Sequence, residues 1–189
     1  GVLIGQANGR LLALNPNDGR VVFDAVIGQA KGITEVERLI DVVGRPWVDQ
    51  ELMCAAAFQG NVVCMHTQNG RLVWNAPVSA VTGPVADGRL VYEVDDAGRL
   101  HAYNRQNGRE AWVNDRFLYR GASAPIRVGA ALAFGDYEGN ITFLDPATGE
   151  AVGRTRLSGA VTTPAAQYGY GAVFQTVEGD VAYVVEGGE

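Results

Sequence analysis

The chain has 189 residues and a formal net charge of −6, with 47% hydrophobic and 19% charged residues. This composition excludes a disordered chain, and the lack of a long apolar run excludes a transmembrane helix. The acidic balance argues against a nucleic-acid partner, because a phosphate backbone repels a negatively charged surface. Glycine is in excess, at 25 residues, which indicates many tight turns and short strands rather than long helices.

A short motif recurs along the chain and predicts how it is organised. Each copy is an anchor glycine followed by a strand that is apolar on both faces, as expected for a sheet covered on both sides. The copies are about 40 residues apart, which is the period of a four-stranded propeller blade. The five anchor glycines are Gly9, Gly60, Gly98, Gly139 and Gly179.

A second glycine and then an aromatic residue follow the anchor glycine in the first three copies. The aromatic residues are Phe23, Trp74 and Trp112, and they recur with the period of the blades. We therefore expect these side chains to pack one blade on the next rather than to bind a ligand. The fourth copy departs from the pattern, with Gly153 at the aromatic position.

The repeat assigns the whole chain to a single all-β propeller domain of four-stranded antiparallel blades. Strands that contain Pro84, Pro125 and Pro164 are expected innermost, because proline lacks an amide hydrogen and suits a sheet edge. The first blade lacks its first strand and the last blade its fourth, so an absent N-terminal portion of a larger ring is expected to supply the missing strand. The predicted parts are a partial blade at 1–27, an insertion loop at 28–46, blades at about 47–78, 79–118 and 119–158, and an incomplete last blade at 159–189.

The two cysteines, Cys54 and Cys64, fall on the two strands of one predicted hairpin. If the hairpin loop centres on Gln59, the cysteines lie opposite one another and close enough for a disulfide. A loop shifted by one residue would leave two small buried thiols instead. Both alternatives remain open from the sequence.

The histidines give no sign of a metal or catalytic site. His66 follows a strand and His101 lies within one, and neither has a second ligand at metal spacing. We expect both to be structural.

The insertion loop is the segment in which the spacing between anchor glycines is longest. Loops of this kind carry function more often than blades do. Thr34 and Glu37 have the spacing of a capping box, and four apolar residues follow a helical period, so a short helical turn is one expectation. A solvated connection with scattered charges is the other. The four apolar residues are Ile33, Val36, Ile40 and Val43.

The pattern Ala-x-Asn/Asp-x-x-x-Gly-x-x-x-Trp resembles the repeat of quinoprotein-type, or PQQ-like, propellers. Within that superfamily, the string Thr-Glu-Val-Glu-Arg-Leu-Ile-Asp-Val at 34–42 is similar to the corresponding segment of the BamB family of outer-membrane assembly factors. The segments at 58–62 and 135–139 are similar to successive blades of that family. The family often has a second acid where this chain has Val43. The resemblance covers nearly all of the chain and implies the C-terminal half of an eight-bladed ring.

This resemblance implies a non-enzymatic scaffold, without cofactor or metal, in the machinery that folds β-barrels into the outer membrane. It also implies a location on the periplasmic side of the Gram-negative outer membrane, with a lipid anchor on an absent N-terminal segment. The implied partners are the POTRA (polypeptide transport-associated) domains of BamA and unfolded outer-membrane proteins. Open blade edges would also let the fragment pair with another copy. The predicted partner-binding residues are Glu35, Glu37, Arg38, Leu39 and Asp41.

The competing interpretation is a fragment of a PQQ-dependent alcohol or sugar dehydrogenase. In those enzymes the ring centre holds PQQ, a calcium ion, a catalytic Asp and adjacent cysteines. Calcium requires six or more oxygen ligands from several carboxylates. The sequence has no adjacent cysteines and no acidic cluster near the expected innermost prolines, which favours the scaffold.

Overall fold

The computed structural model describes residues 1–28 and 40–187, and in these residues the regular structure consists of β-strands. No helix in this described part is long and apolar enough to cross a bilayer. The chain divides into two compact units. One unit is Gly1–Arg89 with Asn104–Arg109, and the other is Leu90–Tyr103 with Glu110–Glu189.

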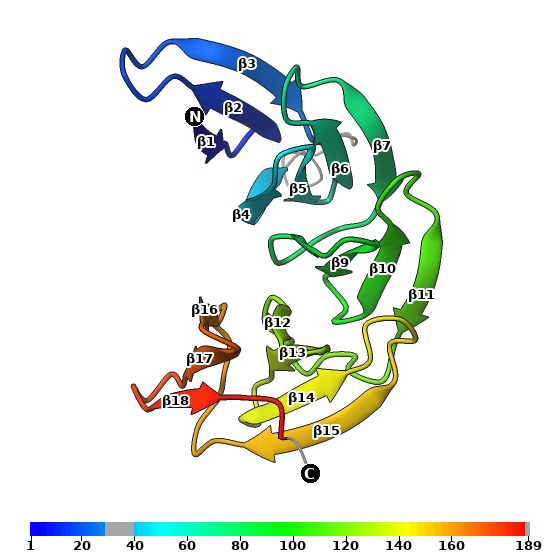
Figure 1. Ribbon diagram of the computed structural model, residues 1–189, viewed down its shortest axis with the longest axis vertical. Coiled ribbons are helices and arrows are strands. Elements are labelled where there is room, and N and C mark those ends of the chain that lie inside the picture. Colours follow the sequence, from blue (N-terminus) through cyan, green and yellow to red (C-terminus); the bar gives the residue numbers. More distant parts are fainter. Residues whose placement is uncertain (29–39, 188–189) are drawn as a thin grey trace. The chain divides into compact units, whose positions relative to one another are not determined.

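The strands form five sheets, and within each sheet the strand order follows the chain and neighbouring strands run antiparallel (Figure 1). The first sheet holds β1 (Val2–Gly5), β2 (Arg10–Leu14) and β3 (Val21–Val26), and the second holds β4 (Asp41–Val48), β5 (Leu52–Phe58), β6 (Asn61–His66) and β7 (Leu72–Pro77). The third holds β8 (Val85–Ala86), β9 (Leu90–Val94), β10 (Leu100–Asn104) and β11 (Glu110–Asn114). The fourth holds β12 (Ile126–Val128), β13 (Ala131–Gly135), β14 (Asn140–Leu144) and β15 (Ala151–Arg156), and the fifth holds β16 (Ala166–Tyr168), β17 (Gly171–Gln175) and β18 (Val181–Val184).

One predicted boundary needs correction, because β4 begins at Asp41 and takes in the last six residues of the predicted insertion loop. The Gly-Arg-Pro sequence at 44–46 suggests a loop, but the structure accommodates it as an irregularity within the strand, between Val43 and Trp47. Gly44 has a positive φ of 61° and lies against the backbone of Gly83, where no side chain would fit. The contact that keeps this segment in the sheet is therefore tertiary.

The prolines that were expected inside first strands stand just ahead of them. Pro84 and Pro125 immediately precede β8 and β12, and Pro164 lies two residues before β16. Each of these strands is at the edge of its sheet, as the lack of an amide hydrogen predicts.

The strands that follow the anchor glycines are the ones predicted to bury both faces, and three of them do so: the four inner residues of β6 and all but one residue of β10 and of β14 are buried. In β2 only alternate residues are buried, and β18 has no fully buried residue, so the prediction is wrong for these two strands. The preceding strands β5, β9 and β13 are buried almost throughout. Each fully buried large apolar side chain contributes about 1.5–3 kcal/mol relative to exposure. One cluster lies in the first unit and includes Leu11, Ile27, Ile40, Met53 and Met65, and another lies in the second unit and includes Tyr92, Leu100, Leu132, Phe134 and Leu144.

The recurring aromatic residues pack on the second glycine of the following repeat, which confirms the predicted packing role. The Trp74 ring lies on Gly108, and its Nε1 donates a hydrogen bond of 2.8 Å to the Arg105 carbonyl. The Trp112 ring lies on Gly149, and its Nε1 donates to the Pro146 carbonyl at 2.9 Å. Phe23 lies on Gly70 in the same way.

The second glycine is required by the ring above it as well as by the turn. Gly108 and Gly149 have positive φ values of 68° and 73°. A Cβ added at Gly108 would lie 2.7 Å from Trp74 Cδ2, and one added at Gly149 would lie 2.6 Å from Trp112 Cε3. Gly19 has a similar φ of 70°, yet nothing lies within 4 Å of an added Cβ. Gly19 therefore shows the effect of the positive φ alone, whereas Gly108 and Gly149 combine the positive φ with close contact to a tryptophan ring.

The question left open for the cysteines is settled by the register of β5 and β6. Cys54 pairs with Cys64, and the two residues form a disulfide with Cα atoms 4.1 Å apart. The loop centres on Gln59, since Ala56 pairs with Val62 across it. Both cysteines are completely buried.

We expect Gly108→Ala and Gly149→Ala to destabilise the full-length protein more than Gly19→Ala does. Gly19→Ala should cost about 1–2 kcal/mol for a left-handed residue. The other two should lose a further ~1–3 kcal/mol, because the methyl group collides with a tryptophan ring. Urea denaturation of the three variants measures the difference, and equal losses would show that the rings do not need the glycines.

We expect the Cys54→Ala, Cys64→Ala double variant to lower the free energy of unfolding by about 2–3 kcal/mol, because the disulfide restricts the unfolded chain. Urea titrations with and without reductant test this. The wild-type protein should lose stability when reduced, whereas the double variant should be insensitive to reductant. An unchanged urea midpoint for the oxidised double variant would contradict a stabilising bridge.

Candidate functional site

The predicted partner site lies on the insertion, and the structure describes one of its five residues. Asp41 is exposed at the first position of β4, where it pairs with Phe58 of β5. The short helical turn expected over this segment also lies outside the described residues. Val43, the last residue of that apolar pattern, belongs to β4. The predicted site residues outside the described part are Glu35, Glu37, Arg38 and Leu39.

The two ends of the insertion meet at the anchor glycine of the first repeat. The amides of Ile27 and Gly28 donate hydrogen bonds of 2.8 and 3.2 Å to the carbonyl of Gly9. On the returning side, Ile40 forms an isolated bridge with Asn8. A Cβ at Gly9 would lie 2.5 Å from both the Gly28 carbonyl oxygen and Ile40 Cγ2, so only glycine fits between the two ends. The insertion therefore starts and finishes at one fixed point of the fold.

A second turn, between β5 and β6, supports the same point. A Cβ at Gly28 would lie 3.3 Å from Gly60 Cα and 3.4 Å from Ala57 Cβ, which is close packing. The Asn61 side-chain amide donates to the Ile27 carbonyl at 3.2 Å. The root of the insertion is thus held by two turns of adjacent sheets in the first unit.

The equivalent turn of the third sheet is braced by a buried carboxylate. Asp95 Oδ1 accepts hydrogen bonds from the amides of Ala97 and Arg99, at 3.0 and 2.7 Å. Its Oδ2 accepts from Arg99 Nε at 2.5 Å and lies 3.2 Å from His101 Nε2. Burial raises the pKa of Asp95, but the hydrogen bonds from Arg99 and His101 together outweigh it and hold that pKa below its usual value. This carboxylate is occupied in shaping the turn.

His101 belongs to the same network, in agreement with its predicted structural role. Its Nδ1 lies 2.8 Å from Glu110 Oε1, and its ring stacks on Tyr103 with the ring centroids 5.9 Å apart. Burial raises the pKa of Tyr103, and the nearby carboxylates act in the same direction. Within the described residues, no group of three His, Cys, Asp or Glu side chains is placed to hold a metal ion.

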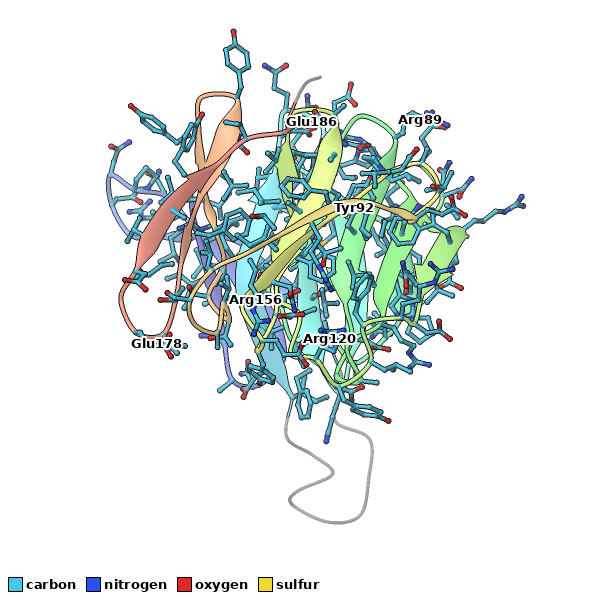
Figure 2. All side chains as sticks on the ribbon, turned by 90° about the horizontal axis from the view of Figure 1, so that it is seen from below. Arg89, Tyr92, Arg120, Arg156, Glu178 and Glu186 are labelled. Carbon is cyan, nitrogen blue, oxygen red and sulfur yellow. A yellow bond between two sulfur atoms is a disulfide. The ribbon has the colours of Figure 1, made fainter. Side chains whose placement is uncertain are left out.

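In the fourth sheet, the equivalent turn is also stabilised by a buried aspartate, which has different side-chain partners. Asp136 Oδ1 accepts from the amides of Glu138 and Asn140, both at 2.9 Å. Arg120, labelled in Figure 2, lies 3.2 Å from Asp136 Oδ2 through Nε and 2.6 Å from Glu138 Oε2 through Nη2. Our reading of the sequence missed these braces, although Asp95 and Asp136 each stand three residues before an anchor glycine.

Comparison with known proteins agrees with this architecture. The family model described as outer membrane protein assembly factor BamB matches residues 1–114. A protein of that name from Alkalilimnicola ehrlichii is 37% identical over 155 residues, which are 82% of this chain and 40% of the relative. Another from Bordetella pertussis is 34% identical over 185 residues, 97% of this chain and 48% of the relative. The chain thus spans less than half the length of these two relatives.

A solved structure gives the same result. The crystal structure of BamB from Moraxella catarrhalis matches 96% of this chain and 54% of its own, with 28% identity and a TM-score of 0.90. The predicted fold class, an all-β propeller of four-stranded antiparallel blades, is confirmed. Since the family model covers more than half of the chain and relatives above 30% identity cover most of it, the chain belongs to the family of the outer membrane protein assembly factor BamB.

Proposed function

We propose that the chain is part of a non-enzymatic scaffold that works on the periplasmic face of the Gram-negative outer membrane. In this proposal the scaffold is held by a lipid anchor and binds the periplasmic POTRA domains of BamA. The observation that carries it is the root of the insertion, where Gly28 and Ile40 both pack closely on Gly9. Loops positioned by rigid scaffolds are common binding sites.

The buried disulfide supports the proposed periplasmic location. A bridge between Cys54 and Cys64 forms and persists in an oxidising environment such as the bacterial periplasm, and such bridges are rare in the cytosol.

The proposed contacts combine charge with one apolar anchor. Arg38 is suited to bidentate contacts with a partner carboxylate, and Leu39 supplies the apolar group that the charges need beside them. Asp41 adds an exposed carboxylate at the start of β4. Charges at the rim mainly raise the association rate, whereas a buried anchor prolongs the complex.

Unfolded outer-membrane proteins are proposed as a second class of partner. β18 is at the edge of its sheet and carries the exposed side chains Val181 and Tyr183. An extended segment can add to such an edge through main-chain hydrogen bonds. The same edge would serve for pairing with another copy of the chain.

We expect Leu39→Ala and Arg38→Ala to weaken binding to the POTRA domains by about 1–2 kcal/mol each, as for moderate hot spots. Asp41→Ala should cost less, because an exposed charge is screened. The measurement is a binding isotherm with each full-length variant, accompanied by its melting curve. Leu118→Ala, which truncates an exposed leucine of the second unit, is the matched control and should bind normally.

Unchanged affinity in all three insertion variants would move the partner site elsewhere on the protein. A lowered melting temperature of these variants would instead show that the residues stabilise the fold.

Because the proposed scaffold has no catalytic role, we expect the full-length protein to retain no quinone after incubation with PQQ and calcium followed by dialysis. The absorbance spectrum measures retention directly. A retained quinone together with turnover of an alcohol would overturn the scaffold and favour a dehydrogenase.

A further inference from the structure

The turn between β5 and β6 differs from the equivalent turn in the other four sheets. In those four, the amide of the anchor glycine donates to the carbonyl three residues earlier, and the anchor glycine has a positive φ. The φ values are 72° at Gly9, 90° at Gly98, 82° at Gly139 and 98° at Gly179. Glycine adopts this conformation without steric cost, so these turns are relaxed.

In the β5–β6 turn the positive φ falls on a residue that has a side chain. Gln59 has a φ of 52°, while Gly60 keeps the usual hydrogen bond, 3.2 Å to the Ala57 carbonyl. A glutamine in the left-handed region is under strain that a glycine would not have. Strain of this kind persists where the surroundings impose it, and it often marks a functional position.

Two hydrogen bonds join this turn to the following segment. The Gln59 amide donates to Ser79 Oγ at 3.0 Å, and the amide of Ala80 donates to the Ala57 carbonyl at 3.2 Å. In three of the equivalent turns, the residue three positions before the anchor glycine has a side-chain oxygen that accepts a backbone hydrogen bond. Ala57 occupies this position in the β5–β6 turn and has no such oxygen. Those oxygens belong to Asp95, Asp136 and Thr176. The bond from Ala80 has counterparts in two other turns, where the amides of Val42 and Val161 donate to the carbonyls of Gln6 and Asp136. The bond from the Gln59 amide to Ser79 is therefore what sets this turn apart, and Gln59 remains exposed.

The strained turn stands beside the root of the insertion. Gly60 packs against Gly28, the first residue of the insertion. Phe58 is partly exposed and pairs across the sheet with the exposed Asp41. The Asp41 carboxylate and the Phe58 ring therefore stand at paired positions of the sheet, and Gln59 follows Phe58 at the turn.

We propose that Asp41, Phe58 and Gln59 form a second part of the partner surface, and that Gln59 determines its specificity. This inference rests on the proposed function. The Gln59 amide donates and accepts, which suits a main-chain amide of the partner, while the Asp41 carboxylate suits a lysine or arginine. The matching partner surface is a cationic side chain beside an exposed stretch of main chain, with an apolar group over Phe58.

Gln59→Gly separates binding from folding. Glycine is favoured at the observed φ, so the turn should be kept and the melting temperature should stay equal or rise. The side-chain amide is lost, and the dissociation constant for the periplasmic domains of BamA should increase at least fivefold. A variant that melts like the wild type and binds like the wild type would overturn the inference.

Tyr119→Gly is the matched control. Tyr119 is the second non-glycine residue of the described chain with a positive φ, at 58°, and it is 83% exposed. The Tyr119→Gly variant relieves the same kind of strain in the second unit, between β11 and β12, so its affinity should be unchanged. An equal loss of affinity in both variants would overturn the assignment to Gln59.

The same titrations distinguish this inference from the proposed function. If Arg38→Ala weakens binding and Gln59→Gly does not, the specificity role of Gln59 fails while the proposed function stands. If the full-length wild type does not bind, both fail together.

Discussion

The contact between an aromatic ring and a glycine of the next repeat is the constraint on which the blades depend. Trp74 on Gly108 and Trp112 on Gly149 combine close packing with a hydrogen bond from the indole nitrogen to a turn carbonyl. A glycine is needed twice in this contact, since the turn requires a positive φ and the ring leaves no room for a Cβ. Three of the glycines, Gly70, Gly108 and Gly149, are thus explained by how the sheets are joined.

The most informative positions are those where the repeat is broken. The fourth copy has Gly153 in place of the aromatic residue, and the second copy has Ala57 in place of the oxygen that braces the turn. The insertion departs from the region of Ala57, between the turns that contain Gly9 and Gly60. A repeat protein can vary there at little cost, because the packing of each sheet depends on its strands rather than on the length of a connection.

The acidic residues illustrate how charge is used in the described part of the chain. Asp95 and Asp136 are almost fully buried, but each accepts backbone hydrogen bonds and faces an arginine. A buried carboxylate is tolerated only when its oxygens are satisfied in this way. These groups stabilise turns, whereas Asp41 is exposed beside the insertion.

The sequence by itself determined the repeat, the doubly buried strands and the packing role of Trp74 and Trp112, because these follow from local periodicity. Tertiary structure alone decided that 41–46 joins a strand, since Gly44 lies against Gly83 from a distant segment. It also decided between bridged and free cysteines, because a shift of one residue in the turn would have separated Cys54 from Cys64. The strained turn at Gln59 has no sequence signal either, as the partner of its amide, Ser79, lies twenty residues along the chain. Local patterns specify which residues are strand and core, whereas the shape of a turn depends on whatever packs beside it.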